Sequence, residues 1–211
     1  MNLKVIIVDY GLGNIRSVQK SVENIFLKSD IKGEVVISST TSGMKDATHY
    51  ILPGQGAFKS CIDGLKKLDG MIEELSDQVL LNKKPILGIC VGMQLFAEQS
   101  FENGVHKGLG WIKGEVLKLP KKNLCLPHMG WNEIKCLNDH PITLGILSSH
   151  FYFVHSYYFN AKISKNILAT SNYGIEFPSF VVDKNIFGVQ FHPEKSSDAG
   201  QALLSNFLIQ K

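Results

Sequence analysis

Cys90 is the most chemically suggestive residue in the sequence, because it lies at the centre of the run Gly-Ile-Cys-Val-Gly over 88–92. Small residues two positions before and after a nucleophile permit a sharp strand-to-helix turn, which exposes the nucleophile above the edge of a sheet. The apolar run that begins at Pro85 predicts a buried strand, and 91–98 predicts the first turns of a helix. The positive end of such a helix favours a thiolate. Alone, the pattern also fits a buried cysteine in a glycine-containing turn.

A candidate base and its orienting acceptor lie about a hundred residues further on. The apolar run 187–191 predicts a strand that delivers His192 at its carboxyl end, and Pro193 ends the strand. Glu194 follows two residues later, where its carboxylate can accept a hydrogen bond from the imidazole. Histidine can take the proton of a thiol and return it to a leaving amine, because its unperturbed pKa is near neutrality. Together the three side chains predict nucleophilic catalysis by cysteine.

The third candidate is a glycine-containing segment, Pro53-Gly54-Gln55-Gly56, which follows the predicted strand 49–52. Alternate glycines after a strand free backbone N–H groups to point at an anion, as in an oxyanion hole. An ordinary loop has the same composition.

Composition and charge exclude several classes of protein. With 211 residues, 44% hydrophobic and 19% charged, the chain predicts one globular domain over 1–211. The net charge of +3 comes from scattered lysines, which is too weak a signal for nucleic acid binding. No apolar run approaches the roughly 18 residues of a membrane span, so we expect a soluble protein.

The cysteines and histidines indicate neither a disulfide framework nor a metal site. The four cysteines show no C-x-x-C spacing, and the chain has no signal-peptide layout, which together predict a reduced, cytoplasmic protein. No histidine pair has metal-ligand spacing, so we expect no metal and no cofactor. We expect surface or turn positions for His49, His106 and His140.

The order of the predicted elements indicates an α/β fold. Strands at 3–9, 35–37, 49–52 and 85–90 alternate with helical patterns, which favours a central, mostly parallel sheet flanked by helices. Ligands of such sheets bind at the carboxyl ends of the strands, where Cys90 and the 53–56 segment fall. Gly11-x-Gly13 lacks the remainder of a dinucleotide fingerprint and predicts a turn or a partner-facing loop.

The second half of the chain predicts additional strands, several of them antiparallel. They are short, aromatic and β-branched, and 183–185 between two of them predicts a hairpin turn. The chain then ends in a helix from about Ser197. The expected strand segments are 111–119, 131–137, 151–158, 167–173, 179–183 and 186–191.

Taken together, 53–56, 88–94 and 191–194 resemble the motifs of class I (triad) glutamine amidotransferases, which have a flavodoxin-like fold. Four further segments resemble the glutaminase subunits of imidazole glycerol phosphate synthase, the HisH family. These segments are 127–132, 152–157, 172–174 and 192–197. The resemblance extends from Lys4 to the C-terminal helix.

The resemblance implies hydrolysis of L-glutamine to L-glutamate and ammonia in two acyl-transfer steps. It implies a catalytic triad of Cys90, His192 and Glu194. The implied oxyanion and substrate-binding residues are Gly54, Gln55, Gly56, Val91, Gln94, Glu102, His155, Ser156 and Tyr157. The family more often carries a small apolar residue at position 55, so Gln55 puts the basal rate and the dependence on a partner in question.

The resemblance also implies a partner that consumes the ammonia, a HisF-type TIM-barrel cyclase, in a heterodimer. The cyclase makes imidazole glycerol phosphate and the carboxamide ribonucleotide AICAR in histidine biosynthesis. We expect the 10–14 loop with Asn14, and also Trp131, Asn132 and Lys195, at this interface. A core position on a strand is the alternative for Trp131.

Three other functions remain open at this point. A paralogous HisH-like glutaminase could supply ammonia for amidination of a surface sugar, and a non-catalytic regulatory subunit could have kept the fold. A cysteine peptidase fits less well, because the local motifs differ from known peptidase signatures.

Overall fold

Parallel strands with continuous apolar runs form the centre of the molecule. The structure is a computed structural model that describes residues 2–121, 124–147 and 149–210. Within these residues an eight-stranded sheet has the order β2-β1-β3-β4-β14-β13-β12-β9. The first five are parallel to one another and the last three antiparallel to their neighbours. In sheet order they are Gly33–Ser38, Leu3–Val8, His49–Gly54, Ile86–Cys90, Ile186–Val189, Glu176–Asp183, Ile167–Asn172 and Lys135–Cys136.

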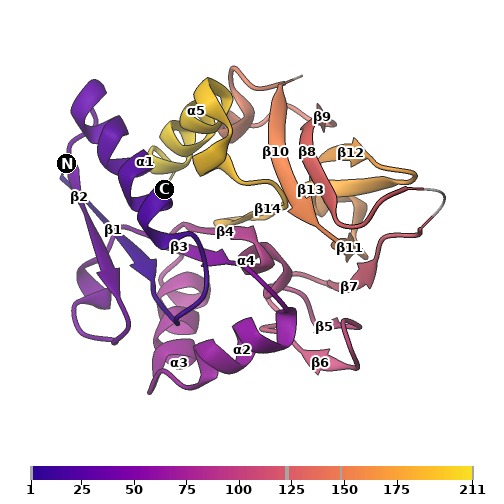
Figure 1. Ribbon diagram of the computed structural model, residues 1–211. Coiled ribbons are helices and arrows are strands. Elements are labelled where there is room, and N and C mark those ends of the chain that lie inside the picture. Colours follow the sequence, from indigo (N-terminus) through magenta and orange to yellow (C-terminus); the bar gives the residue numbers. More distant parts are fainter. Residues whose placement is uncertain (1, 122–123, 148, 211) are drawn as a thin grey trace.

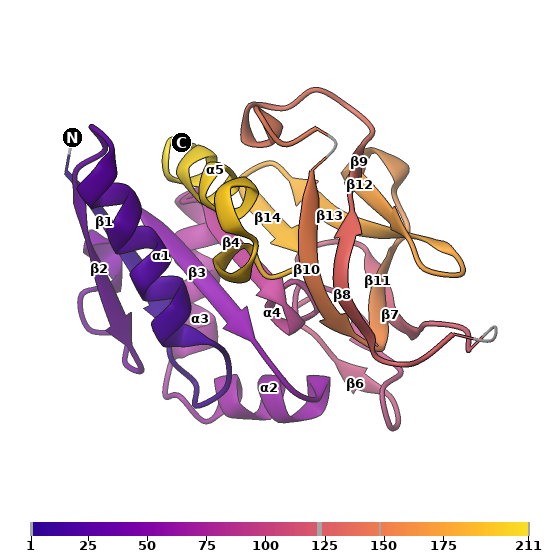
Figure 2. The ribbon, with the colours of Figure 1, turned by 45° about the horizontal axis from the view of Figure 1, so that its top comes forward.

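Helices cover both faces of this sheet, as its apolar strands require. In Figures 1 and 2, α1 (Ile15–Lys28) and α5 (Ser197–Leu208) lie on one face, and α2 (Phe58–Lys66) and α3 (Met71–Ser76) lie on the other. Helix α1 buries Val18, Val22 and Ile25, one stripe at helical spacing. The short helices are the π-helical η2 (Asp77–Leu81) and the 3-10 turns η1 (Met44–Asp46), η3 (Pro141–Thr143), η4 (Ser164–Asn166) and η5 (Pro193–Lys195).

Two smaller sheets of the second half lie beside the carboxyl ends of the central strands (Figure 2). Strands β8 (His128–Glu133) and β10 (His150–His155) form an antiparallel pair. The other sheet has the order β11-β7-β5-β6, which are Tyr157–Ala161, Gly114–Lys118, Gln99–Ser100 and His106–Lys107. The predicted α/β class, with parallel strands first and antiparallel strands later, is confirmed.

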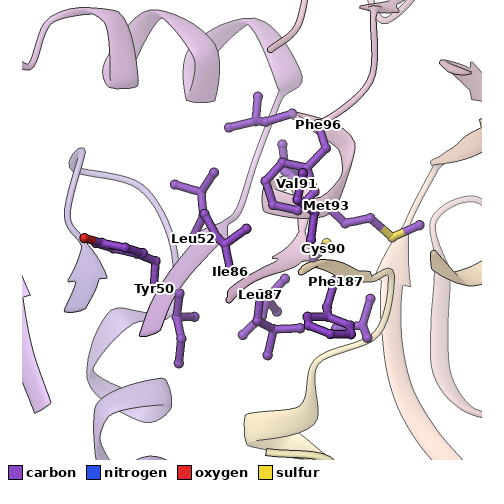
Figure 3. Close-up of a cluster of buried hydrophobic side chains, with 14 of the residues drawn as sticks. Tyr50, Leu52, Ile86, Leu87, Cys90, Val91, Met93, Phe96 and Phe187 are labelled. Atoms are coloured by element: carbon purple, nitrogen blue, oxygen red, sulfur yellow. The ribbon is translucent and has the colours of Figure 1, made fainter. Parts of the chain in front are cut away.

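The core continues up to the edge of the sheet at which Cys90 lies. Figure 3 shows Cys90 beside the buried side chains of β3, β4 and the segment that follows β4, among them Leu52, Ile86 and Phe96. Because packed interiors deform little, this surrounding fixes the position of the sulfur.

The predicted helix over 91–98 is wrong in its length, since α4 comprises only Val91–Gln94. The carbonyl of Leu95 accepts from Leu109 N–H at 2.8 Å, and the carbonyl of Phe96 accepts from Ile112 N–H at 3.0 Å. The N–H groups of Phe96 and Ala97 donate three residues back, to Met93 and Gln94, and the N–H of Glu98 donates to the carbonyl oxygen of Gly114 at 3.0 Å. The helix therefore ends, because the N–H that would continue it bonds to a returning segment. The predicted hairpin turn at 183–185 is confirmed, with Lys184 at φ +57°.

His49 is not the surface residue that we expected, since only 3% of it is exposed. Its Nδ1 lies 3.0 Å from Thr48 Oγ1 and its Nε2 lies 3.2 Å from the carbonyl oxygen of Gln210. The ring also packs edge-on against Phe207, with centroids 5.2 Å apart. The end of the chain therefore buries His49, and the residues around position 49 in the sequence do not predict this burial.

In the described part of the chain, none of the helices combines the length and apolar character that crossing a membrane needs.

Burial of His49 makes the stability of the fold depend on pH. Desolvation lowers the pKa of His49 to about 4, whereas in the unfolded chain it returns to 6.5. The unfolded chain therefore binds more protons below pH 6.5, and stability present above that value is lost as the pH falls towards 4. We expect His49 to account for a loss on the order of 2 kcal/mol between pH 7.5 and pH 5. Urea unfolding of the unsubstituted chain and of His49→Gln at both values measures it. The variant should lose less stability over this interval, and equal losses would contradict the assignment.

Candidate active site

Cys90 lies at a strained turn between β4 and α4, as its flanking glycines predicted. Its backbone has φ +55° and ψ −110°, a conformation that non-glycine residues rarely adopt. A Cβ atom at Gly92 would lie 1.8 Å from the carbonyl oxygen of Leu52, and one at Gly88 would lie 2.6 Å from the Phe96 ring. Strand β3 thus approaches Gly92, and the segment after Cys90 approaches Gly88, so closely that only glycine fits on either side of the cysteine.

The structure brings His192 and Glu194 together beside this turn. Their side chains are 3% and 0% exposed, and Nδ1 of His192 lies 2.9 Å from Oε1 of Glu194. Because a carboxylate can only accept, Nδ1 carries the proton and Nε2 is left to exchange a proton with the sulfur. Nε2 is buried and makes no hydrogen bond within the described residues.

The charges around His192 favour its protonated form. Burial opposes that form, but Cys90 and Glu194 outweigh it and raise the pKa of His192 to about 10. At neutral pH the site therefore favours an imidazolium at position 192, between the Glu194 carboxylate and the Cys90 sulfur.

The backbone of His192 is held from two sides. Its N–H donates to the carbonyl oxygen of Tyr152 on β10 at 2.9 Å, and the hydroxyl of Ser196 donates to its carbonyl oxygen at 2.6 Å. The same hydroxyl accepts from the N–H of Tyr152 at 3.0 Å. Strand β10 and the start of α5 thus fix the histidine over the sheet edge.

Cys90 and His192 share one cavity of about 300 Å³ with most of the predicted substrate-binding residues. The other lining residues are Gln55, Gly56, Val91, Gln94, Glu102, Pro127, Val154, His155, Ser156 and Tyr157. Gly54 is not among them, because it lies in β3, buried and paired with Cys90. Glu194 lies behind His192.

The glycine segment at the mouth of this cavity is held through its carbonyl groups. The hydroxyl of Tyr10 donates to the carbonyl oxygen of Pro53 at 2.6 Å. The thiol of Cys61 donates to the carbonyl oxygen of Gln55 at 3.4 Å. Gln55 and Gly56 are exposed, and Gly56 has φ +94°.

Two polar side chains that line the cavity, Gln94 and Glu102, are themselves anchored. Gln94 is 2% exposed, and its Nε2 donates at 3.0 Å to both the carbonyl oxygen of Tyr157 and Oε1 of Gln190. Glu102 Oε2 accepts from the N–H of Phe58, the first residue of α2, at 2.6 Å. Both can hold a polar ligand without first becoming ordered themselves.

A pair of buried histidines lies at the wall of the cavity, with His155 lining it and His128 behind His155. Nδ1 of His155 lies 2.9 Å from the carbonyl oxygen of Tyr157, and its Nε2 lies 3.0 Å from Nδ1 of His128. Since the carbonyl can only accept, His155 carries its proton on Nδ1 and His128 donates to it. Desolvation lowers the pKa of His155 to about 3 and that of His128 to about 4, so both are neutral.

The four residues expected at a partner interface lie outside the cavity. Trp131 is 54% exposed on β8, so it is not a core residue, and Nζ of Lys195 lies 5.8 Å from the centroid of the Tyr152 ring. Asn132 donates to the carbonyl oxygen of Asn172 at 2.9 Å. Asn14 instead reaches the triad, because its Nδ2 donates to Oε1 of Glu194 at 3.2 Å.

Sequence reasoning missed three residues of this region, Pro127, Val154 and Gln190. The first two line the cavity, and Gln190 places its Nε2 3.6 Å from the sulfur of Cys90. The period of two along an extended chain could have found Gln190, because it shares a side of the backbone with His192.

A thiol, a buried imidazole and a carboxylate that orients it form a site for nucleophilic acyl transfer by cysteine. The four cysteines are free. Within the described residues, no cluster of three or more histidine, cysteine or acidic side chains is arranged to hold a metal ion.

Comparison with solved structures places this site on a known fold. The structure of PurLQS from Thermotoga maritima matches 99% of this chain and 98% of its own, with a TM-score of 0.73 at 18% identity. A structure described as a glutamine amidotransferase matches 95% of this chain and 98% of its own, with a TM-score of 0.69 at 17% identity. These likenesses concern the fold.

Comparison at the level of sequence identifies the family. The model of the family "Glutamine amidotransferase class-I" matches residues 6–211. Imidazole glycerol phosphate synthase subunit HisH of Pelagibacter ubique is 44% identical over 98% of this chain and 99% of its own. Subunit HisH 1 of Campylobacter jejuni is 45% identical over 96% and 98%. The chain therefore belongs to the class I glutamine amidotransferases and, within them, to the HisH family.

The close approach of Gly92 to Leu52 predicts that a side chain at position 92 destabilises the protein. We expect Gly92→Ala to destabilise the protein by about 3 kcal/mol or more, because the new methyl group would overlap the Leu52 carbonyl. Gly145→Ala is the control, since Gly145 has open space around its Cα, so that its substitution costs only the strain of its positive φ, +77°. That substitution should cost only about 1 kcal/mol. Urea unfolding of both variants measures the difference, and equal losses would refute the steric account.

Proposed function

We propose that this protein is the glutaminase subunit of an imidazole glycerol phosphate synthase, folded as one amidotransferase domain over 1–211 and working in the cytoplasm. The observation that carries the proposal is that Cys90 and His192 line one cavity, with Glu194 hydrogen-bonded to His192 from behind. More than 40% identity to HisH subunits, over nearly the full chain, supports the choice of reaction.

In the first step the thiolate of Cys90 attacks the side-chain amide carbon of L-glutamine. The carbonyl oxygen becomes an oxyanion, for which backbone N–H groups of the 54–56 segment and of Val91 are the candidate donors. His192 then gives its Nε2 proton to the departing nitrogen, so that ammonia leaves and a glutamyl thioester remains on Cys90. Each oxyanion donor contributes about 3 kcal/mol to such a step.

In the second step water hydrolyses the thioester. His192, now neutral, takes a proton from the water that attacks the thioester carbon, and Cys90 leaves as a thiolate. L-Glutamate is released, and the imidazolium and thiolate are restored. Glu194 keeps the imidazole in the same orientation through both steps, because it stays hydrogen-bonded to Nδ1.

The anchored polar groups of the cavity suit the amino-acid end of glutamine. Gln94 and Glu102 are the proposed partners of its polar head, with the backbone of His155, Ser156 and Tyr157 along the wall. The Glu102 carboxylate can pair with the α-ammonium group. The cavity opens beside Gln55 and Gly56, so the exposed Gln55 can affect how readily the oxyanion segment adopts its active form.

The proposed partner is a HisF-type TIM-barrel cyclase that receives the ammonia in a heterodimer. The exposed indole of Trp131 fits an interface anchor, and Asn132, Lys195 and Asn14 complete the proposed contact surface. Asn14 also donates to Glu194, so a partner that contacts the 10–14 loop would touch a neighbour of the triad directly.

Replacement of Cys90 by serine separates the two halves of the reaction. We expect the complex of Cys90→Ser with its barrel partner to lose glutamine-dependent synthesis of imidazole glycerol phosphate by at least 10³-fold, because serine is not activated as a thiolate is. Synthesis with added ammonia should persist, since it bypasses the thiol. Cys125→Ser, a substitution of an exposed cysteine outside the cavity, is the control that should retain both activities. Full glutamine-dependent activity in Cys90→Ser would exclude Cys90 as the nucleophile.

Growth distinguishes the histidine pathway from amidination of a surface sugar. Deletion of the gene should abolish growth without histidine, and supplementation should restore it. Normal growth of the deletion strain without histidine would favour the paralogous sugar pathway. Release of no glutamate from glutamine by the purified complex would favour a non-catalytic subunit.

A further inference from the structure

We propose that Gln190 is a positioning residue that donates an N–H hydrogen bond to the Cys90 sulfur and thereby stabilises its thiolate. The inference rests on the proposed function only in that the thiolate is the nucleophile. Gln190 does not line the cavity, so it acts on the sulfur and not on the substrate.

The position of Gln190 is fixed by the sheet. Its N–H donates to the carbonyl oxygen of Ser179 at 2.9 Å, which extends the pairing of β13 and β14 by one residue. The residue is completely buried, and its Nε2 lies 3.6 Å from the Cys90 sulfur. A buried amide that reached no partner would be costly, so the contact with sulfur satisfies it.

The orientation of the Gln190 amide follows from the backbone carbonyl of Tyr157, which can only accept hydrogen bonds. The carbonyl oxygen of Tyr157 accepts from Gln94, so the nitrogen of Gln94, and not its oxygen, faces Tyr157. The same nitrogen lies 3.0 Å from Gln190, which must therefore present its oxygen to Gln94. The nitrogen of Gln190 is consequently left to face the sulfur.

The other polar neighbour of the sulfur has the opposite effect. The carbonyl oxygen of Val154 lies 3.9 Å from it, where it can accept from the neutral thiol but repels the thiolate. When the thiol proton moves to Nε2 of His192, the hydrogen bond from the Gln190 N–H to the sulfur becomes stronger, because hydrogen bonds to charged acceptors are stronger. Gln190 keeps its own protons throughout.

The pH dependence of Cys90 alkylation by iodoacetamide tests this role without any glutamine. Peptide-resolved mass spectrometry on the full chain follows Cys90 separately from the other three cysteines. The variant Gln190→Met keeps the length of the side chain but has no hydrogen-bond donor. In it we expect the pH midpoint of Cys90 alkylation to rise by about one pH unit. In Gln190→Glu it should rise at least as far, because a carboxylate would face the thiolate.

Gln78→Met is the matched control, since Gln78 is also a buried glutamine but is hydrogen-bonded to Glu74 and Asn82. Its Cys90 profile should match that of the unsubstituted chain. In the complex, Gln190→Met should lower kcat for glutamine about tenfold at pH values below the Cys90 midpoint, with a smaller change in KM and unchanged ammonia-dependent synthesis. A merely structural role would leave the alkylation midpoint in place.

NMR of the unsubstituted chain keeps the proposal open to refutation even where a variant fails to fold. The side-chain N–H resonances of Gln190 should shift with the same midpoint as Cys90 alkylation, and this titration should vanish in Cys90→Ala. Superimposable alkylation profiles for Gln190→Met and the unsubstituted chain, or resonances that ignore the titration of Cys90, would overturn the proposal. If the complex of the unsubstituted chain released no glutamate from glutamine, while Gln190→Met still showed the predicted alkylation shift, the result would count against the proposed function alone.

Discussion

The site depends on the contact between α4 and the end of β3, where only hydrogen atoms separate the two backbones. Gly92 packs against the Leu52 carbonyl so closely that any side chain would force them apart. This contact obliges the chain to reverse within one residue after β4, and Cys90 takes the strained φ of +55°. The strained conformation of Cys90 persists because packed side chains of the sheet surround the turn and hold it (Figure 3). The sulfur therefore points into the cavity at the edge of the sheet.

The charges of the site are possible in a buried position only because each is paired. Glu194 is buried behind His192, where an unpaired carboxylate would be strongly destabilising, and it accepts from both His192 and Asn14. His192 in turn faces a sulfur that can hold the negative charge. A carboxylate, an imidazolium and the Cys90 sulfur thus follow one another from the interior to the cavity. These hydrogen bonds extend from the 10–14 loop to the cavity, so a change at Asn14 can reach His192 through two contacts.

Sequence patterns predicted the parts of the molecule that have local causes. Continuous apolar runs gave the parallel strands, and the glycines around Cys90 gave the turn, because both follow from sterics over a few residues. The length of α4 could not be predicted, since the N–H of Glu98, which would continue the helix, bonds to the distant Gly114. The contact of Asn14 with Glu194 spans 180 residues of sequence and the burial of His49 depends on the last helix, so neither has a local signal. Gly54 had the composition of a loop but lies in β3, because its pairing partner is Cys90 itself.

The central claim is that Cys90, alone among the four cysteines, is an activated nucleophile directed at a glutamine-shaped cavity. Treatment of the complex with a glutamine analogue that carries a diazoketone in place of the amide tests it most directly, with the modified peptide located by mass spectrometry. The account predicts one covalent adduct per chain, on Cys90, that excess L-glutamine prevents and that coincides with the loss of glutaminase activity. An adduct on Cys61, Cys125 or Cys136 that parallels inactivation, or complete labelling of Cys90 that leaves the activity intact, would contradict it.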